Sequence, residues 1–411
     1  MANKGDIIVG LDIGTTKVAA VVGEVTEDGT DIIGIGSHPS AGLHKGVVVN
    51  IDATCDSINK AVDEAEQMAG VEISTVYAGI AGGHISSFNN NGIVAVKNRE
   101  ITKGDVDRVI EQAKAVAIPL DREVIHAIPQ GYVVDDQDGV RNPIGMNGVR
   151  LEGNVHIITG AVTSAQNIVK CAQRCNLNVA DIVLEQIASS NSVLYDDEKE
   201  LGVAMVDIGG GTTDLIIYVD GAVAHTSVIS IGGKHLTADI AMGLRTPKSE
   251  AEIIKKLHGC ALLRLVDPDE TIEVPSVGGR PPVIQPKEVL AHIIEPRIEE
   301  MFMLVQRAIL ESGYAELLAS GLVVTGGASL LEGLPEAAEE IIGMPVRRGI
   351  PFGFGEMGDL VANPIYATGA GLVNYGARMD SHLRSKVIRA REQKVYPKVL
   401  SRMSGWFKEI F

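Results

Sequence analysis

The feature that most constrains this 411-residue chain is a near-repeat of one short pattern in its two halves. Residues 8–22 read IVGLDIGTTKVAAVV, and residues 203–219 read VAMVDIGGGTTDLIIYV. Each copy is an apolar strand that ends in Asp-Ile-Gly, followed by a Thr-rich turn and a second apolar strand. Because each copy opens one half of the chain, the repeat predicts a duplicated domain that forms two equivalent lobes.

The two turns have the composition of a phosphate-binding site. Gly-rich hairpin turns point several backbone N–H groups at one phosphate, and glycine leaves the approach unobstructed. Threonine hydroxyls add donors, and a lysine neutralises phosphate charge. The alternative is that both segments are ordinary hairpin turns, but their matching positions in the two halves favour phosphate binding. The predicted phosphate-binding residues are Gly14, Thr15, Thr16, Lys17, Gly209, Gly210, Gly211, Thr212 and Thr213.

The aspartates that precede the two turns indicate a cation. Asp12 and Asp207 stand at strand ends beside the predicted phosphate loops. Carboxylates that face a polyphosphate repel it unless a cation lies between them, so we expect Mg²⁺ there, held through bound waters. Two facing lobes would then clamp the phosphates from both sides.

Two segments of the second half have the spacing of an adenosine site. Leu322–Gly327 reads LVVTGG, a strand that meets a glycine turn, and Gly326, Gly327 and Ala328 would let the chain pass close to a flat adenine ring. Glu252 and Lys255 lie three positions apart on one face of a predicted helix, where they would reach the ribose and base. An ordinary surface ion pair explains the spacing of Glu252 and Lys255 equally well.

The overall composition is that of an ordinary globular protein, with 45% hydrophobic and 22% charged residues. The net charge of −17 excludes nucleic acid as a partner of the body of the chain. Residues 380–411 differ, because they hold eight Lys/Arg against three Asp/Glu, a net charge of +5 that indicates a separate partner for the tail. The absence of a signal peptide and of a long apolar run predicts a cytoplasmic location or a cytoplasmic membrane face. We expect free thiols at Cys55, Cys171, Cys175 and Cys260.

Residues from about 84 to 159 interrupt the first half with a pattern of their own. Strands are predicted near Ile93–Lys97, Val124–Val134 and Val149–Ile158, with a helix from about Lys103 to Ala117 that Thr102 caps. This order of elements predicts a small inserted α+β module rather than a long loop.

The second half carries two helices with distinctive boundaries. Ser249–Glu252 has the form of a capping box that begins a helix through Leu257. A long helical pattern runs from Lys287 to Leu310, and we expect Pro296 to kink or divide it. The Pro/Gly-rich stretch Pro275–Pro286 before it is predicted to be a surface loop.

The last 15 residues, PKVLSRMSGWFKEIF, have the periodicity of an amphipathic helix. Such a helix is about 22 Å long, too short to cross a bilayer but suited to lie in its interface. The basic spacer before it favours an anionic membrane surface, whereas the alternative is a helix docked on the protein itself or on a partner. The apolar stripe comprises Val399, Leu400, Met403, Trp406, Phe407, Ile410 and Phe411.

The segments LDIGTTK, VDIGGGTTDL and VVTGGAS, in that order, resemble the phosphate-1, phosphate-2 and adenosine segments of the actin, sugar-kinase and heat-shock-chaperone ATPase superfamily. With the insert and the tail, essentially the whole chain resembles the FtsA family of bacterial cell-division proteins. The resemblance implies an α/β, actin-like two-lobed fold of duplicated ribonuclease-H-like domains, with a small α+β subdomain inserted in lobe 1. It also implies ATP and Mg²⁺ as cofactors.

The resemblance implies a division of the chain into nine segments. Lobe 1 comprises a core at 1–83 and 162–195, the inserted subdomain at 84–161 and a closing helix at 363–379. Lobe 2 comprises a core at 196–228 and 303–362 and a peripheral subdomain at 229–302. A flexible basic linker at 380–396 and the membrane-targeting helix at 397–411 follow.

The resemblance also assigns roles to individual residues. Asp12 and Asp207 would organise Mg²⁺, and Glu185 matches the position that orients the attacking water in relatives. From its position alone, Glu185 is only a polar residue at a helix start. Arg297 and Glu300, one helical turn apart, are candidates for binding the carboxy-terminal peptide of the tubulin-like division protein FtsZ. An intrahelical ion pair on a solvated face is the alternative for these two residues.

The function implied by the resemblance is that of an ATP-binding assembly protein. It would polymerise head-to-tail at the cytoplasmic face of the membrane, tether the FtsZ ring at the division site and recruit later division proteins, with at most slow ATP hydrolysis. A small-molecule phosphotransferase would need a base aimed at an acceptor hydroxyl, and no acidic motif supplies one. A chaperone ATPase would need a peptide-binding domain, for which too few residues remain after Tyr375. The insert and the position of the amphipathic helix also argue against an actin-like adaptor of a pilus or secretion machine, but less strongly.

Overall fold

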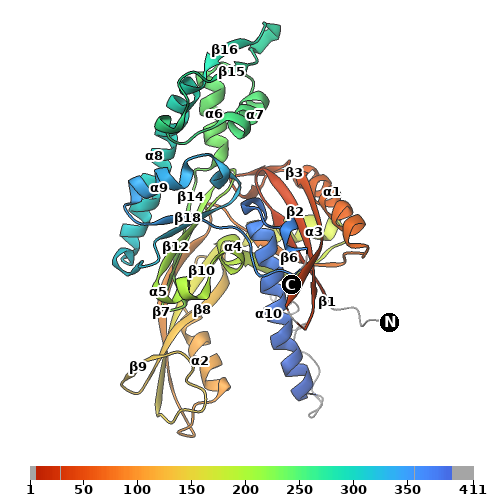
Figure 1. The fold of residues 1–411 in the computed structure, drawn as a ribbon. Helices are drawn as coiled ribbons and strands as arrows, with labels where there is room; N and C mark the ends of the chain where they lie inside the picture. Colours follow the sequence, from red (N-terminus) through yellow and green to blue (C-terminus); the bar gives the residue numbers. More distant parts are fainter. Residues whose placement is uncertain (1–5, 28, 356, 391–411) are drawn as a thin grey trace.

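The structure is a computed structural model that describes residues 6–27, 29–355 and 357–390, and it has two lobes, each built on a five-stranded sheet (Figure 1). The strand order is β11-β6-β1-β2-β3 in lobe 1 and β14-β13-β12-β17-β18 in lobe 2. In lobe 1, β1 pairs with β2 as an antiparallel hairpin and with β6 as a parallel neighbour. In lobe 2, β12 pairs in the same way with β13 and β17. The prediction of a duplicated domain with an actin-like arrangement is therefore confirmed.

The strands of the two sheets have the following bounds. Lobe 1 contains β1 (Asp6–Ile13), β2 (Lys17–Val25), β3 (Thr30–Pro39), β6 (Thr75–Ile80) and β11 (Asn178–Leu184), with a small hairpin of β4 (Leu43–His44) and β5 (Val47–Val48). Lobe 2 contains β12 (Val203–Ile208), β13 (Thr213–Val219), β14 (Ala222–Ile229), β17 (Leu322–Thr325) and β18 (Val346–Arg348).

Helices and sheets alternate in layers, because every strand near the centre of a sheet is apolar on both faces. Helices α1 (Ile51–Ala69) and α3 (Val162–Arg174) cover the outer face of the lobe 1 sheet. Helices α4 (Glu185–Val193) and α10 (Ala367–Ala390) lie between the two sheets. Helices α8 (Lys287–Ser312) and α9 (Leu334–Ile342) cover the outer face of the lobe 2 sheet. The short α5 (Asp196–Leu201) contacts β13, where Lys199 lies over the Tyr218 ring.

Helix α1 illustrates how the local sequence sets these elements. The Asn50 side chain accepts a hydrogen bond from the Ala53 N–H and so caps the first turn. Gly70 ends the helix with φ = 65°, a left-handed conformation that glycine adopts without strain. The apolar residues between, among them Ile58 and Ala61, recur with helical spacing and are fully buried against the sheet.

The inserted segment forms a separate four-stranded sheet, with the order β7-β10-β8-β9, that carries one helix. The strands are β7 (Ser86–Ala95), β8 (Arg122–Val134), β9 (Gln137–Val140) and β10 (Arg150–Ala161), and the helix is α2 (Lys103–Lys114). The prediction of an α+β module is confirmed. The predicted strand at Ile93–Lys97 is shifted, because β7 begins at Ser86, where polar residues of this strand contact lobe 2.

A further group of helices extends lobe 2 at the end far from the insert (Figure 1). It contains α6 (Gly233–Gly243), α7 (Lys248–His258) and the amino-terminal part of α8. The hairpin of β15 (Thr271–Val274) and β16 (Val283–Pro286) projects from it, so the stretch expected to be only a loop ends in a short strand.

The two predicted helices of this region are confirmed, but the expected capping box and the division at Pro296 are not found. Helix α7 begins at Lys248 after Pro247, and no side chain caps it. The expected capping box fails because the Glu252 carboxylate instead accepts hydrogen bonds from Thr237 and Lys255. Helix α8 is not divided at Pro296 but runs on to Ser312, since residues on both sides of the proline are buried in the lobe 2 core.

Helix α10 also differs from the prediction, since it continues to Ala390, into the segment expected to be a flexible linker from residue 380. Residues 380–390 contain neither proline nor glycine, so nothing local ends the helix. Residues 391–411, which include the predicted amphipathic helix, lie outside the described residues. Within the described part of the chain, no helix is long and apolar enough to cross a membrane.

Candidate functional site

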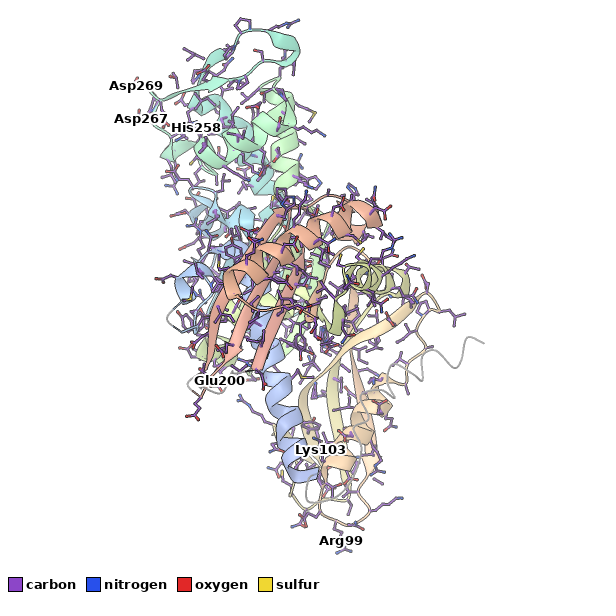
Figure 2. All side chains as sticks on the ribbon, turned by 90° about the vertical axis from the view of Figure 1, so that its right-hand side faces the viewer. Arg99, Lys103, Glu200, His258, Asp267 and Asp269 are labelled. Atoms are coloured by element: carbon purple, nitrogen blue, oxygen red, sulfur yellow. The ribbon has the colours of Figure 1, made fainter. Side chains whose placement is uncertain are left out.

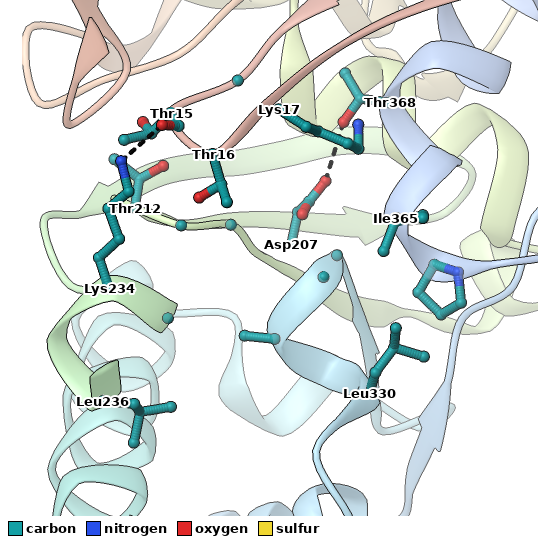
Figure 3. Close-up of a pocket in the computed structure, with 18 of the residues that line it drawn as sticks. Thr15, Thr16, Lys17, Asp207, Thr212, Lys234, Leu236, Leu330, Ile365 and Thr368 are labelled. Carbon is teal, nitrogen blue, oxygen red and sulfur yellow. Dashed lines mark hydrogen bonds between the residues drawn. The ribbon is translucent and has the colours of Figure 1, made fainter. Parts of the chain in front are cut away.

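A cavity of about 780 Å³ lies between the two lobes, at the turns of the two repeated hairpins (Figure 3). This volume is in the range of small-molecule and cofactor sites. Most of the residues predicted from the sequence meet in it. They are Asp12, Gly14, Thr15, Thr16, Lys17, Glu185, Asp207, Gly209, Gly210, Thr212, Glu252, Lys255, Gly326, Gly327 and Ala328.

The first loop joins β1 to β2 and presents one acid and one base to the cavity. Asp12 is 6% exposed, and its Oδ2 accepts a hydrogen bond from Lys17 Nζ at 2.6 Å. Lys17 also lies 5.6 Å from the centre of the Tyr366 ring. The lysine is thus held beside the glycine turn, where it can meet an anionic ligand.

The second loop joins β12 to β13 and packs closely on the first. A Cβ atom added to Gly210 would lie 1.8 Å from Thr16 Oγ1, so only glycine lets the two loops approach this closely. Lys234, which follows the loop in space, donates a hydrogen bond from Nζ to the Thr15 carbonyl at 2.7 Å (Figure 3). The two lobes therefore touch through polar groups at the predicted phosphate site.

Two of the predicted phosphate-binding residues do not line the cavity. The Thr213 hydroxyl donates to the Ile231 carbonyl at 2.8 Å, because alternation along β13 turns it away from the neighbouring lobe. Gly211 packs instead against Lys45 and Thr15, which a Cβ atom on it would approach to 2.9 Å. The prediction treated every residue of the turn alike, whereas the register of the hairpin selects some of them.

Another wall of the cavity is formed where the chain passes from β17 into a glycine turn. Gly326 has φ = 82°, and a Cβ atom on it would lie 2.3 Å from Asp207 Oδ1, so the backbone must be bare here. Lys255 Nζ donates to Glu252 Oε2 at 2.7 Å and to the Gly233 carbonyl at 3.1 Å. Burial lowers the pKa of Lys255, and the nearby Glu252 carboxylate only partly offsets this.

Four carboxyl groups gather at the centre of the cavity. Burial, followed by the like charges of Asp12, Asp214 and Asp207, raises the pKa of Glu185 well above its usual value. Burial also raises the pKa of Asp214 to about 7 and raises the pKa of Asp207. Glu185 is the first residue of α4, directly after β11, so the strand–helix turn aims it into the cavity.

Helices α4 and α10 support the carboxylate of Asp207 from behind. Its Oδ2 accepts a hydrogen bond from Ser189 at 2.5 Å and another from Thr368 at 3.3 Å (Figure 3). Helix α10 comes close to α4 at Gly371, where a Cβ atom would lie 1.8 Å from the Ala188 carbonyl oxygen. Both helices are therefore fixed relative to the second loop.

The sequence reasoning missed several residues of this site. Asp214 ends the repeated motif itself, and Lys234 follows a Gly-Gly pair, so both carried a local signal. Ser189 and Thr368 carried none, because they reach Asp207 only through the packing of α4 and α10 between the sheets.

The donor set suits a hydrated divalent cation rather than a directly ligated one. Among the described residues, no group of three or more His, Cys, Asp or Glu side chains is arranged to hold a metal ion. Asp214 Oδ1 is buried without a hydrogen-bond partner, and Glu185 faces three like charges. Such carboxylates are stabilised by a cation that reaches them through waters.

The other predicted partner residues lie elsewhere. Arg297 on α8 donates to Asp239 Oδ2 at 2.6 Å and also pairs with Glu300 one turn away. The pair predicted to bind a partner peptide is thus engaged within the subdomain. The four cysteines are free thiols, as expected.

The two lobes, the repeated hairpins and the cavity between them define the class of actin-like two-lobed proteins. Similar folds occur in the PilM-PilN type IV pilus biogenesis complex (TM-score 0.64, 16% identity, 90% of this chain and 98% of that one) and in MreB 5 of Spiroplasma citri bound to AMPPNP (TM-score 0.55, 14% identity, 93% and 100%). The MamK double helical filament is a further one (TM-score 0.51, 13% identity, 90% and 98%). At these identities the likeness concerns the fold alone.

Sequence comparison is more specific. The family model described as Cell division protein FtsA matches residues 204–371, and the one described as SHS2 domain inserted in FTSA matches residues 82–159. Cell division protein FtsA of Pseudomonas aeruginosa is 53% identical over 99% of both chains, and that of Neisseria meningitidis is 46% identical over 98% of both. The chain belongs to the FtsA family of cell division proteins.

Proposed function

We propose that this chain binds ATP with Mg²⁺ between its lobes and uses the bound nucleotide to control its assembly at the division site. The observation that carries the proposal is the meeting of the two repeated hairpin turns in one cavity of about 780 Å³. A solved protein of similar fold, MreB 5 of Spiroplasma citri, is bound to AMPPNP, which supports a nucleotide as the ligand.

The residues of each loop would share the work of holding the phosphates. Backbone N–H groups at Gly14 and Gly210 would donate to phosphate oxygens, and Lys17 and Lys234 would neutralise their charge. The Gly209 N–H holds the turn itself, because it donates to the Thr212 carbonyl at 3.0 Å. Gly326, Gly327 and Ala328 would flank the adenine, and Glu252 with Lys255 would meet the ribose. Mg²⁺ would supply positive charge between the phosphates and the two aspartates, Asp12 and Asp207.

Glu185 is the candidate for a proton acceptor at the γ-phosphate end. Its pKa is raised by burial and by the three neighbouring carboxylates. Cation binding in the cavity would lower that pKa, because the positive charge stabilises the ionised form. Loading of the cavity would thus favour the ionised, proton-accepting form of Glu185.

Within the family function, we propose that the chain polymerises head-to-tail and links the FtsZ ring to the membrane, where it recruits later division proteins. A fold neighbour that forms a double helical filament supports self-association. The carboxy-terminal peptide of FtsZ would bind the subdomain at 229–302. Since Arg297 is already paired with Asp239 and Glu300, such a peptide would have to exchange these ion pairs.

The tail at 397–411 would hold the protein on the cytoplasmic face of the cell membrane as a peripheral protein. Its predicted apolar stripe contains the only Trp of the chain, Trp406, and basic residues flank it. Each cation near an anionic surface would contribute roughly 1 kcal/mol to binding.

Nucleotide binding is tested by isothermal titration calorimetry with Mg-ATP. The variant Asp207→Ala is expected to bind at least about tenfold more weakly, because it loses a charge-assisted contact with the cation. The exposed Asp269, at the far end of lobe 2 (Figure 2), provides a matched control as Asp269→Ala. An unchanged affinity in Asp207→Ala would count against the clamp.

Membrane attachment is tested separately by sedimentation with anionic liposomes. Removal of residues 397–411 is expected to leave the protein in the supernatant while Mg-ATP affinity stays at the full-length value. If the truncated protein still sediments with the liposomes, the tail is not the membrane anchor.

A further inference from the structure

One face of the inserted sheet contacts both lobes at once. The register of its strands places Asn89 on β7, His156 on β10 and Ile128 on β8 opposite one another, so that their side chains share this face. The next row on the same face contains His126 of β8. The other face packs on α2, which leaves the row of Asn89 and His156 to meet the lobes.

The contact with lobe 2 consists of hydrogen bonds to the outer edge of its sheet. Strand β14 is an edge strand, so its outer backbone groups have no neighbouring strand. Insert side chains take that place. Ser87 Oγ donates to the Thr226 carbonyl at 2.8 Å, and Asn89 Nδ2 donates to the Ala224 carbonyl at 3.2 Å. Gln130 Nε2 donates to the Val223 carbonyl at 2.9 Å.

His156 is the buried centre of this contact, with 1% of its surface exposed. Its Nδ1 lies 2.5 Å from Asn89 Oδ1, and its Nε2 lies 3.0 Å from Thr226 Oγ1. Because the Asn89 oxygen only accepts, Nδ1 carries the proton, and Nε2 accepts from the Thr226 hydroxyl. One imidazole ring therefore links a strand of the insert to a strand of lobe 2.

The contact with lobe 1 is made by the second histidine of the same face. His126 Nε2 accepts a hydrogen bond from the Leu184 N–H at 3.0 Å. Leu184 is the last residue of the edge strand β11 and the residue before Glu185. His126 thus fixes the turn that aims Glu185 into the cavity.

Both contacts lead into the cavity within a few residues. Strand β14 ends at Ile229, and Gly233 then donates its N–H to the Gly209 carbonyl at 2.9 Å. Lys234 N donates to the Gly210 carbonyl at 2.8 Å. The insert is therefore attached to the strands that lead into Glu185 of α4 in lobe 1 and Lys234 of α6 in lobe 2.

We propose that the inserted subdomain is a second connection between the lobes, in which His126 and His156 are positioning residues for the nucleotide cleft. Any relative movement of β11 and β14 must break or slide these hydrogen bonds, so docking of the insert and the geometry of the cleft are coupled. Coupling of this kind is reciprocal. A ligand that changes the docking of the insert would change the affinity of the cleft for nucleotide, and nucleotide in the cleft would change the docking of the insert. The inference rests on the nucleotide binding proposed above.

The test compares two replacements of one histidine in the full-length protein. His156→Leu removes both hydrogen bonds, whereas His156→Gln keeps a donor and an acceptor at similar positions. Lys103→Ala, an exposed residue at the start of α2 (Figure 2), is the control. Release of a fluorescent ATP analogue in the presence of Mg²⁺ is measured by stopped flow. We expect release at least about fivefold faster in His156→Leu, the lower end of typical couplings, and near the wild-type rate in the other two variants.

Hydrogen exchange supplies the second measurement. Mg-ATP is expected to slow exchange of the amides of Leu184 and residues 223–229 in the wild type, and to do so less in His156→Leu. If His156→Leu fails to fold, Asn89→Ala takes its place. This variant removes the hydrogen bonds of Asn89 to His156 and to the Ala224 carbonyl, on the more exposed side of the contact. Wild-type release kinetics in a folded variant would overturn the coupling, whereas a wild-type protein that binds no nucleotide would overturn the proposed function itself.

Discussion

Asp214 provides a direct test of the electrostatics of the cavity. It is 3% exposed, Oδ2 accepts one hydrogen bond from Thr212, and Oδ1 has no partner. Burial raises its pKa from the usual 3.8 to about 7. A carboxyl group whose folded pKa lies above its unfolded value binds protons better when folded, so stability falls as pH rises from about 4 to about 7. Replacement by the neutral amide, Asp214→Asn, removes this cost.

The size of the effect follows from the two pKa values. With one pKa unit equal to about 1.36 kcal/mol, the buried charge costs about 4 kcal/mol at pH 8 and about 2 kcal/mol at pH 5. In Asp214→Asn, the amide Nδ2 takes the place of the unpartnered Oδ1. This buried, unpaired amide lowers the free energy of unfolding by about 1–3 kcal/mol at either pH. Between pH 5 and pH 8, the stability of Asp214→Asn relative to wild type is therefore expected to rise by about 2–3 kcal/mol.

The assay is urea unfolding at pH 5 and pH 8 without nucleotide, followed by far-UV circular dichroism because the only Trp lies in the tail. Asp269→Asn, an exposed replacement at the end of lobe 2, is expected to change stability by less than about 0.5 kcal/mol at both values. A difference between Asp214→Asn and wild type that does not depend on pH would refute the reasoning.

Three further perturbations have distinct expected outcomes. Lys234→Met removes the ammonium group that spans the lobes, and Mg-ATP is expected to bind roughly tenfold more weakly by titration calorimetry. Gly371→Ala places a Cβ atom 1.8 Å from the Ala188 carbonyl oxygen, so thermal unfolding is expected to show a loss of about 1–3 kcal/mol. Thr213→Val removes a hydrogen bond to Ile231 outside the cavity, so unfolding should show a loss of about 1 kcal/mol. Calorimetry should find its Mg-ATP affinity within about twofold of wild type, and a tenfold loss would restore Thr213 to the phosphate site.

The sequence predicted the parts of the fold that depend on short-range patterns. Two strand–turn–strand copies fixed the two hairpins, and hairpin geometry then placed Asp12 and Asp207 at equivalent ends. The insert was recognisable because strands and a helix followed one another inside a stretch too long for a loop. Helix ends were less predictable, since tertiary contacts override local signals, as Glu252 shows by leaving its expected cap for Thr237 and Lys255.

What the sequence did not predict arises from contacts between distant elements. Ser189 and Thr368 are 179 positions apart and meet at one oxygen of Asp207. Nothing local marks either residue, because their proximity depends on how α4 and α10 pack. The same holds for His126 and His156, whose shared face is defined only by the register of three strands.

The distribution of polar and apolar contacts indicates where the two lobes are able to move. Around α4 and α10 they share one apolar cluster, which includes Ile8 and Val21 of lobe 1 and Met205 and Val323 of lobe 2. Separation of the lobes at this cluster would expose apolar surface to water, and the free-energy cost would grow with the exposed area. At the hairpin turns and along β14 the lobes instead meet through hydrogen bonds, each worth about 1 kcal/mol net because water replaces them. The cheapest relative motion is thus a rotation about the α4–α10 layer, and that motion strains the cavity and the contact at His156 together.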